Sequence, residues 1–564
     1  MRTVNGMETS MAIGTEDFAE VRSNYYFVDK TGFISEYFSH HARHAKVTLL
    51  ARPRRFGKTM LMSMMHRFLD IRGADENRKL FDGLKVTKDA HVMAEQGMRP
   101  VVFLTLRDWE AGKWEEMQKF IAFGLQDSCR SLHYLLESDA VTEKDKRDFQ
   151  MLEERKGNLS LMRRALVLFC RMLENHYGKK AVLLIDEYDA PIQCAWSHGY
   201  YKEAIEFYRG FFAAALKSNP SLDFAILTGV LRIAKESIFS GLNNLEVSTV
   251  VSGGYPDACG YTREEVAKMA RDLGHEDKLA ELASWYDGYA FQGVDIYNPW
   301  SVNNYFKQDC KARAYWVNTS GNSILRTMLE DVTAVREREL AGLMEGKTIP
   351  VQLDEAFIYQ NIGQKKDDLY TLMLFTGYLK CVGIESDEDD DETYELSIPN
   401  REIRSVFRRE ILDNLSGHVG RSILRDMMQA MLEGDTDIFE SCLRQILRGM
   451  VSFYDVAHPE SFYHGMMLGM TVWLDKKFTI QSNRESGYGR FDLALFPKTK
   501  DLPGVLMEFK SAKSEEDLQR EAEKAQQQML ERGYSASMKD AGVERIWCYG
   551  IAFFGKQVFV TMVS

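Results

Sequence analysis

Short apolar runs rich in β-branched residues alternate with longer stretches of helical periodicity through the first 255 residues. Such runs, bounded by turn residues, predict buried strands, and the stretches between them predict helices. Alternating strands and helices are typical of a mostly parallel sheet that is covered on both faces. The predicted strands are residues 47–51, 101–106, 181–186, 224–228 and 247–251, and the clearest helices are 60–69 and 161–176.

From about residue 260 the pattern becomes mixed and mainly helical. It begins with a capping signal, in which Thr262 is followed three residues later by a glutamate. Residues 370–382 and 393–398 predict two strands around the acidic run 387–392, which we interpret as a solvated hairpin tip because like charges repel. Residues 401–415 then predict a helix, and the whole region predicts a helical, winged-helix-like lid.

The last part of the chain predicts a second, smaller α/β unit. A helical connection over residues 423–449 precedes two strand-like segments, 489–495 and 505–510. Residues 515–532 then show helical periodicity.

Length and composition restrict the class of protein. A chain of 564 residues exceeds one hydrophobic core, and 45% hydrophobic with 27% charged residues is typical of a folded soluble protein. We expect a cytoplasmic protein without a membrane partner, because no apolar window is long enough to span a bilayer and the N-terminus lacks a signal pattern. The eight cysteines form no CxxC pair and predict buried thiols. A net charge of -12 argues against a surface that binds nucleic acid everywhere, but it permits a local basic groove.

Residues 47–59, VTLLARPRRFGKT, place an apolar strand, a loop and the start of a helix in succession. This order suits a phosphate-binding loop, because the loop N–H groups and the helix N-terminus direct positive dipoles at the phosphates. In such a loop Lys58 reaches the β- and γ-phosphates, and the Thr59 hydroxyl ligates magnesium. Gly-Lys-Thr alone is weak evidence, and Arg52 stands where GxxxxGK[ST] has its first glycine.

A later strand supports the nucleotide site. The run AVLLIDE, residues 181–187, ends in two carboxylates, of which Asp186 is expected to hold the magnesium shell and Glu187 to polarise the attacking water. A further strand delivers Thr228, either as a sensor of the γ-phosphate or as a strand-end cap. Arg232 follows, either as a transition-state arginine or as a solvated loop residue.

These segments resemble the bacterial and archaeal AAA-ATPase-like proteins that carry a C-terminal PD-(D/E)XK nuclease-like domain. The matching stretches are YFVDKT (26–31), RPRRFGKT (52–59), LIDEYDAP (184–191), LTGV (227–230) with GLNN (241–244), and WYDGY (285–289) with YNPW (297–300). The loop of that family characteristically reads RPRRFGK, so the resemblance makes Arg52 a family feature. The two aromatic segments are expected to dock the lid onto the core.

The resemblance implies ATP and Mg²⁺ as cofactors. The residues expected around the nucleotide are Arg52, Pro53, Arg54, Arg55, Phe56, Gly57, Lys58, Thr59, Met60, Asp186 and Thr228. By analogy with related ATPases, Asp29, Lys30 and Thr31 are expected near the adenine, and a helix-capping turn is the alternative for this segment.

A second set of candidate residues lies near the C-terminus. Glu508 and Lys510 are two apart on a predicted strand and therefore project to one face. If Asp492 lies on a neighbouring strand, the two carboxylates would share a magnesium ion and Lys510 would position the nucleophilic water. The segments SNRE, GRFD, MEFK and AQQQ resemble the PD-(D/E)XK phosphodiesterases, which implies supporting roles for Glu485 and Gln528.

The sequence therefore predicts an α/β protein with a P-loop (ASCE/AAA-like) parallel-sheet core over residues 1–255 and a lid over 256–420. A helical linker, 421–450, and a restriction-endonuclease-like α/β domain, 451–564, complete the prediction. The predicted function is an ATP-hydrolysing switch coupled to a magnesium-dependent nuclease-like domain acting on DNA or RNA. The alternative is a nucleotide-dependent interaction protein that binds a partner without cleavage, and the oligomeric state is open.

Overall fold

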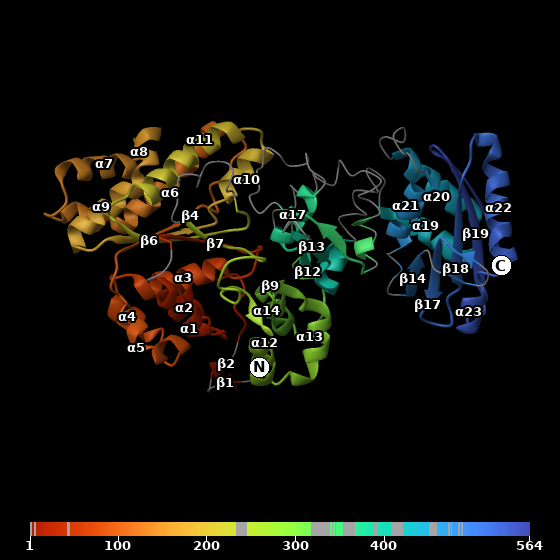
Figure 1. The fold of residues 1–564 in the computed structure, drawn as a ribbon, viewed down its shortest axis with the longest axis horizontal. Coiled ribbons are helices and arrows are strands. Elements are labelled where there is room, and N and C mark those ends of the chain that lie inside the picture. Colours follow the sequence, from red (N-terminus) through yellow and green to blue (C-terminus); the bar gives the residue numbers. More distant parts are fainter. Residues whose placement is uncertain are drawn as a thin grey trace. The chain divides into compact units, whose positions relative to one another are not determined.

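The computed structural model of the chain describes residues 3–4, 7–8, 10–41, 45–232, 245–316, 339–340, 342–344, 346–353, 367–386, 392–407, 421–449, 459–471, 474, 477–482, 485–486 and 489–564. It divides into two compact units, which are described separately (Figure 1). The first consists of Met1–Leu325 and Pro350–Ile403, and the second of Arg326–Ile349 and Arg404–Ser564. No helix in the described part of the chain is both long enough and apolar enough to cross a membrane.

A five-stranded parallel sheet forms the core of the first unit, and its order is β4, β5, β6, β3, β7. The strands are β3 (Val47–Ala51), β4 (Val101–Thr105), β5 (Ala181–Asp186), β6 (Leu222–Gly229) and β7 (Leu245–Ser248). Every residue of β3 and β5 is buried, as expected for strands of a parallel sheet with both faces covered. The predicted parallel P-loop-type sheet is confirmed.

Helices cover both faces of this sheet, and Figure 1 shows α1–α5 on one side and α6–α11 on the other. The first group is α1 (Phe18–Asn24), α2 (Gly32–His41), α3 (Lys58–Leu69), α4 (Ala74–Lys79) and α5 (Ala90–Met93). The second is α6 (Trp114–Leu132), α7 (Glu143–Glu153), α8 (Leu159–Arg163), α9 (Ala165–Tyr177), α10 (Ala190–Ser197) and α11 (Tyr201–Phe212). The helix predicted over residues 161–176 is therefore two helices that meet at Arg164.

A small antiparallel sheet and three helices follow in the same unit. The sheet has the order β8 (Tyr261–Thr262), β10 (Val294–Tyr297), β9 (Tyr289–Phe291), and the helices are α12 (Arg263–Leu273), α13 (Leu279–Tyr286) and α14 (Pro299–Lys307). The predicted capping box at Thr262 is present at the start of α12. The side chain of Asn298 caps α14 by accepting from the N–H groups of Trp300 and Ser301.

The strand predicted over residues 370–382 is wrong in its first half, because α17 (Asp368–Thr376) is a helix that ends at Gly377. Its side chains are buried all around, so the apolar run carries no periodicity that separates a helix from a strand. The strands β12 (Lys380–Ser386) and β13 (Glu392–Ser397) pair antiparallel beside β11 (Ile349–Val351). Residues 387–391 of the acidic run lie outside the described residues. The next predicted helix, 401–415, is helical over residues 401–407, and its residues 408–415 lie outside the described residues.

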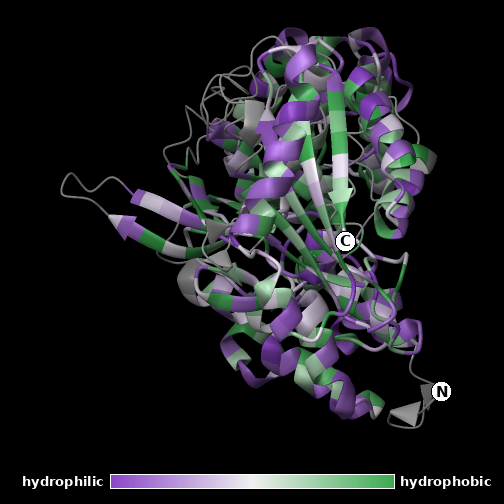
Figure 2. Cartoon of the chain, turned by 90° about the vertical axis from the view of Figure 1, so that its right-hand side faces the viewer, coloured by the Kyte–Doolittle hydropathy of each residue, from purple (hydrophilic) through white to green (hydrophobic). Residues whose placement is uncertain are grey.

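The second unit is built on a mixed sheet with the order β14, β17, β18, β19, β20, in which only the β18–β19 pair is parallel. Its strands are β14 (Phe478–Ser482), β17 (Leu493–Pro497), β18 (Gly504–Ser511), β19 (Ile546–Phe554) and β20 (Gln557–Val563). The helices α19 (Arg421–Glu433), α20 (Thr436–Gly449) and α21 (Pro459–Thr471) share one apolar core with the sheet. Between β18 and β19 runs α22 (Leu518–Glu531), and Figure 2 shows hydrophobic strands beside helices with hydrophilic outer surfaces.

Candidate functional site

The carboxyl ends of parallel strands meet at one edge of a sheet, where α/β proteins bind their ligands. A cavity of about 460 Å³ lies at this edge in the first unit. Its walls come from an N-terminal segment, the loop after β3, the first turn of α3, the loops after β4 and β5, residues 258–261, and the start of α14. Of the predicted nucleotide contacts, those lining this cavity are Lys30, Arg54, Arg55, Phe56, Gly57, Lys58, Thr59 and Met60.

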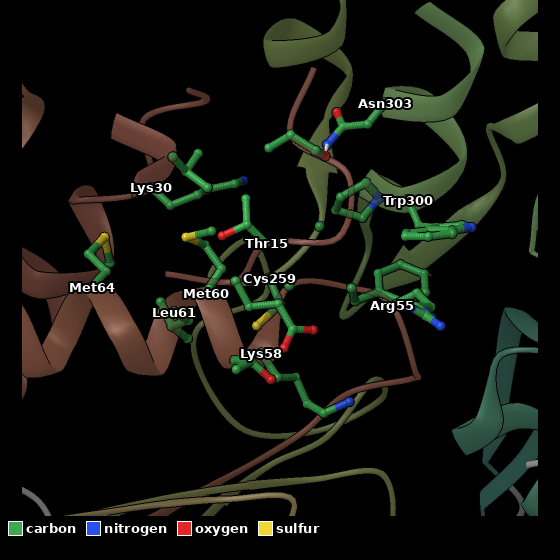
Figure 3. Close-up of a pocket in the computed structure, with 18 of the residues that line it drawn as sticks. Thr15, Lys30, Arg55, Lys58, Met60, Leu61, Met64, Cys259, Trp300 and Asn303 are labelled. Carbon is green, nitrogen blue, oxygen red and sulfur yellow. Dashed lines mark hydrogen bonds between the residues drawn. The ribbon is translucent and has the colours of Figure 1, made fainter. Parts of the chain in front are cut away.

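The loop after β3 leads into α3 through Gly57, whose φ of 91° is a left-handed conformation that favours glycine. The next residue, Lys58, donates from Nζ to the carbonyls of Arg52 and Pro53, each at 3.1 Å. Figure 3 shows its ammonium group directed away from Thr15. The Lys58 ammonium is therefore hydrogen-bonded within the loop. A phosphate bound to the loop N–H groups would compete with these carbonyls for the ammonium group.

Asp186, at the end of β5, joins the first turn of α3 to the end of β6. Its Oδ2 accepts from the Thr59 hydroxyl at 2.7 Å, and its Oδ1 accepts from the hydroxyl of Thr228. The carboxylate is fully buried. Hydroxyl and carboxylate oxygens are the ligands that Mg²⁺ prefers, so Thr59 and Asp186 have the chemistry to hold this ion.

Glu187 follows Asp186 and turns into the cavity with a positive φ of 51°. Burial raises the pKa of this carboxyl, and the nearby charge of Lys58 opposes the rise. A carboxylate with a raised pKa is a better proton acceptor, which suits it to polarise a water molecule.

Arg52, which replaces the first glycine of a P-loop, lies behind the loop and does not line the cavity. Its guanidinium is buried and donates to the carbonyls of Ala51, Ser248 and Tyr255 and to the hydroxyl of Ser248, at 2.8–3.0 Å. Burial lowers the pKa of Arg52 to about 10, so it stays charged at neutral pH. Arg52 therefore anchors the start of the loop to the end of β7, and Pro53 contributes its carbonyl to Lys58.

Only Lys30 of the three residues expected near the adenine lines the cavity. It donates to the carbonyl of Asp257 at 3.0 Å and pairs with Glu265 at 2.5 Å. Asp29 instead accepts from the N–H and hydroxyl of Thr31 and from the backbone N–H of Lys85, the first residue of a 3₁₀ helix (Lys85–Lys88). Asp29 and Thr31 thus have the geometry of the alternative, a turn that supports the start of α2.

Tyr188 and Asp189 were missed by sequence reasoning, although they belong to the LIDEYDAP stretch. The Asp189 carboxylate accepts from the N–H groups of Val230 and Leu231, both at 2.9 Å, and the Tyr188 hydroxyl donates to the Leu231 carbonyl at 2.6 Å. These bonds fix the turn after β6 that leads to Arg232, which does not line the cavity. Their signal was two more polar side chains directly after the acidic pair.

Aromatic residues of the predicted lid contact the phosphate-binding loop. The Phe56 ring lies 4.9 Å from Tyr289 and 5.2 Å from Phe291, measured between ring centroids. The Arg55 guanidinium lies 4.4 Å from the ring centroid of Trp300 (Figure 3). These contacts join the loop to β9 and α14. A displacement of the Phe56 or Arg55 side chain would therefore alter the packing of both elements.

The second unit brings together the three residues predicted for its site. The carboxylate of Asp492, just before β17, accepts from the N–H of Phe509 in β18 at 2.8 Å, which places it beside Glu508. The Lys510 ammonium lies 3.6 Å from Oε1 of Glu508, and the same oxygen accepts from the Gln528 amide of α22. The side chain of Glu485 lies outside the described residues.

Glu508 is only 3% exposed, and burial together with the charge of Asp492 raises its pKa to about 7. Its Oε2 has no hydrogen-bond partner among the described residues. A buried carboxylate oxygen without a donor is costly, and a bound cation would satisfy it. Among the described residues, Asp492 and Glu508 are the two carboxylates that lie together at this site. The pair suits magnesium, which keeps several of its own waters.

Comparison with known proteins assigns both regions. Residues 12–239 match the family described as "Predicted AAA-ATPase", and residues 458–562 match the PD-(D/E)XK nuclease superfamily. The chain is also 28% identical over 407 residues to a protein of Azotobacter chroococcum mcd 1 described as "Uncharacterized protein in vnfD 5'region". That alignment covers 71% of this chain and 70% of the relative.

Proposed function

The chain carries a predicted AAA-ATPase-like domain at residues 12–239 and a C-terminal PD-(D/E)XK nuclease superfamily domain at 458–562, and on this premise we propose that it is an ATP-hydrolysing switch that controls magnesium-dependent cleavage of DNA or RNA. The observation that carries the proposal is the convergence of Thr59 and Thr228 on the buried carboxylate of Asp186, directly behind the cavity that Thr59 and the loop line.

In the first unit, the N–H groups of the loop and the Lys58 ammonium bind the phosphates. Thr59 and Asp186 hold Mg²⁺, which when bound neutralises phosphate charge. Glu187 accepts a proton from the attacking water, and its raised pKa favours this role. Thr228 keeps Asp186 oriented toward Thr59, because both hydroxyls donate to the same carboxylate.

In the second unit, Asp492 and Glu508 hold a magnesium ion, and the unpaired Oε2 of Glu508 supports this assignment. Magnesium when bound would polarise a phosphodiester and a water molecule. Lys510 stabilises the nucleophilic water and the negative charge that develops, and the Gln528 amide fixes the rotamer of Glu508.

The alternative is a nucleotide-dependent interaction protein whose C-terminal domain binds a partner and cuts nothing. One observation favours it, namely the net charge of -12, which argues against a broad surface that binds nucleic acid. Both functions use the same nucleotide site, so only the C-terminal chemistry separates them.

Incubation of the full chain with Mg²⁺, ATP and labelled single- and double-stranded DNA and RNA tests the two functions. We expect cleavage by the natural chain and none by Lys510→Ala, while Lys513→Ala, an exposed lysine three residues away, keeps full activity. Cleavage that survives Lys510→Ala would remove the nuclease assignment. Partner binding without cleavage by the natural chain would favour the alternative.

Hydrolysis of ATP is tested by release of phosphate. Glu187→Gln should bind ATP with little change and turn it over at least about a hundredfold more slowly, as for loss of a general base. Unchanged turnover in this variant would show that Glu187 does not accept the proton.

A further inference from the structure

Arg107 lies in the loop after β4 and lines the cavity, yet the proposed hydrolysis assigns it no role. Its Nη1 pairs with Oε2 of Glu16 at 2.5 Å, and both side chains are 45% exposed. Glu16 and Arg107 lie 91 residues apart in the sequence, and Glu16 also lines the cavity. The ion pair therefore stands at the mouth of the nucleotide cavity.

The backbone places Arg107 beside the acidic pair that follows β5. Thr105 is the register partner of Asp186, and the N–H of Leu106 donates to the Asp186 carbonyl at 2.9 Å. Arg107 is the next residue, and the hydrogen bond that it donates to Glu16, together with the charges of Glu16 and Glu187, raises its pKa. A guanidinium within electrostatic reach of Glu187 is also near the place where a terminal phosphate would meet the attacking water.

Glu16 is the end of an N-terminal segment that crosses the cavity wall. Near its start, the Ala12 carbonyl accepts from the Asn303 amide at 3.2 Å, which ties the segment to α14. Ala12, Gly14, Thr15 and Glu16 all line the cavity. The segment is thus held at α14 by one hydrogen bond and at the loop after β4 by the ion pair.

We propose that Arg107 is a specificity-determining residue that contacts the terminal phosphate of a nucleoside triphosphate, and that this phosphate displaces Glu16 from it. The proposal rests on the proposed nucleotide binding at this cavity. A guanidinium fork binds a phosphate in two places, and a phosphate carries more charge than the carboxylate it would replace. An exposed ion pair contributes little to stability, so the exchange has a small cost. A diphosphate is too short to make the exchange and leaves the pair intact.

A purely structural ion pair makes a different prediction. If Glu16 and Arg107 only fasten the N-terminal segment, removal of either partner should lower the thermal stability and weaken triphosphate and diphosphate binding alike. If they exchange, the two single variants act in opposite directions on the triphosphate alone, because Glu16 competes for the group that binds it.

Calorimetric titration of the full chain with a non-hydrolysable ATP analogue and with ADP, both with Mg²⁺, separates these cases. We expect Arg107→Ala to weaken binding of the analogue by about tenfold or more, as for loss of one charged hydrogen bond. Binding of ADP should weaken by less than about twofold. Glu16→Gln should strengthen binding of the analogue a few-fold and leave the affinity for ADP unchanged. Arg130→Ala, which removes an exposed arginine paired with Asp127 on α6, is the matched control and should change neither.

Each other outcome is decisive. Equal losses for both nucleotides in Arg107→Ala, or no loss for either, overturn the exchange while leaving nucleotide binding established. Weaker analogue binding in Glu16→Gln overturns it as well. Failure of the natural chain to bind any nucleotide overturns the proposed function itself, and the role of Arg107 falls with it.

Discussion

Replacing Glu508 by glutamine should stabilise the second unit in the absence of metal while abolishing its response to magnesium. The group is buried and its pKa is raised from 4.5 to about 7. A carboxyl with a raised pKa favours the fold only in its protonated form, so its contribution is present below pH 4.5 and is lost as the pH rises through about 7.

The gap between an ordinary pKa of 4.5 and one of about 7 corresponds to a ceiling of roughly 3 kcal/mol at pH 8. Glutamine keeps the oxygen that accepts from Gln528, carries no charge beside Asp492, and leaves Lys510 without its partner at 3.6 Å. We therefore expect Glu508→Gln to raise the unfolding free energy of this unit by roughly 1 to 3 kcal/mol at pH 8 and by much less at pH 5.

Differential scanning calorimetry of the full chain at both pH values, first with a chelator and then with Mg²⁺, measures these effects. Magnesium should raise the transition of the second unit in the natural chain and not in the variant, because binding to the folded state alone stabilises it. Glu523→Gln, an exposed change on α22, is the control and should behave as the natural chain. A variant that is less stable at pH 8, or one that keeps the full magnesium response, would refute the reasoning.

Four further substitutions test the first unit. Glu402 is buried, accepts from the Ser301 hydroxyl and the N–H groups of residues 315 and 316, and has a pKa raised to about 7 by burial. Because the raised pKa makes the ionised carboxylate unfavourable in the fold, Glu402→Gln should raise the thermal midpoint at pH 8 and not at pH 5. An equal gain at both pH values would contradict this. Arg52→Ala removes four buried hydrogen bonds and should cost roughly 3 kcal/mol or more, whereas Arg54→Ala, at the cavity wall, should weaken nucleotide binding without lowering the midpoint. Asp189→Ala loosens the turn after β6 and should slow ATP hydrolysis more than it weakens ATP binding, which parallel turnover and titration measurements would decide.

The sequence was sufficient to predict the parallel sheet, because β3 and β5 are buried on both faces and are short, mainly apolar runs. The order of strand, loop, helix and acidic strand end predicted Thr59 and Asp186 at one magnesium site, and in the structure the Thr59 hydroxyl donates to the Asp186 carboxylate at 2.7 Å. The same argument failed for α17, whose mainly apolar run forms a buried helix. An apolar run reports burial, and only flanking residues and length report its conformation.

Other features of the site depend on distant contacts that no local pattern contains. Arg52 belongs to the loop motif, yet its guanidinium turns toward Ser248 and Tyr255, far along the chain. The pairing of Glu16 with Arg107 joins two ordinary charged residues, and neither one carries a motif. The unsatisfied oxygen of Glu508 likewise emerges only when neighbouring strands bury the carboxylate. Local order thus predicted which groups are candidates to bind phosphate, and tertiary contacts decide which groups support them.

The most direct test of the central claim is calorimetric titration of Mg²⁺-ATP into the full chain and into Lys58→Ala, with the exposed Lys79→Ala as control. We predict saturable binding by the natural chain and by Lys79→Ala, and at least about a hundredfold weaker binding by Lys58→Ala, as for loss of a cation that contacts phosphate. Equal ATP affinity in Lys58→Ala and the natural chain would contradict the assignment of this cavity as the nucleotide site.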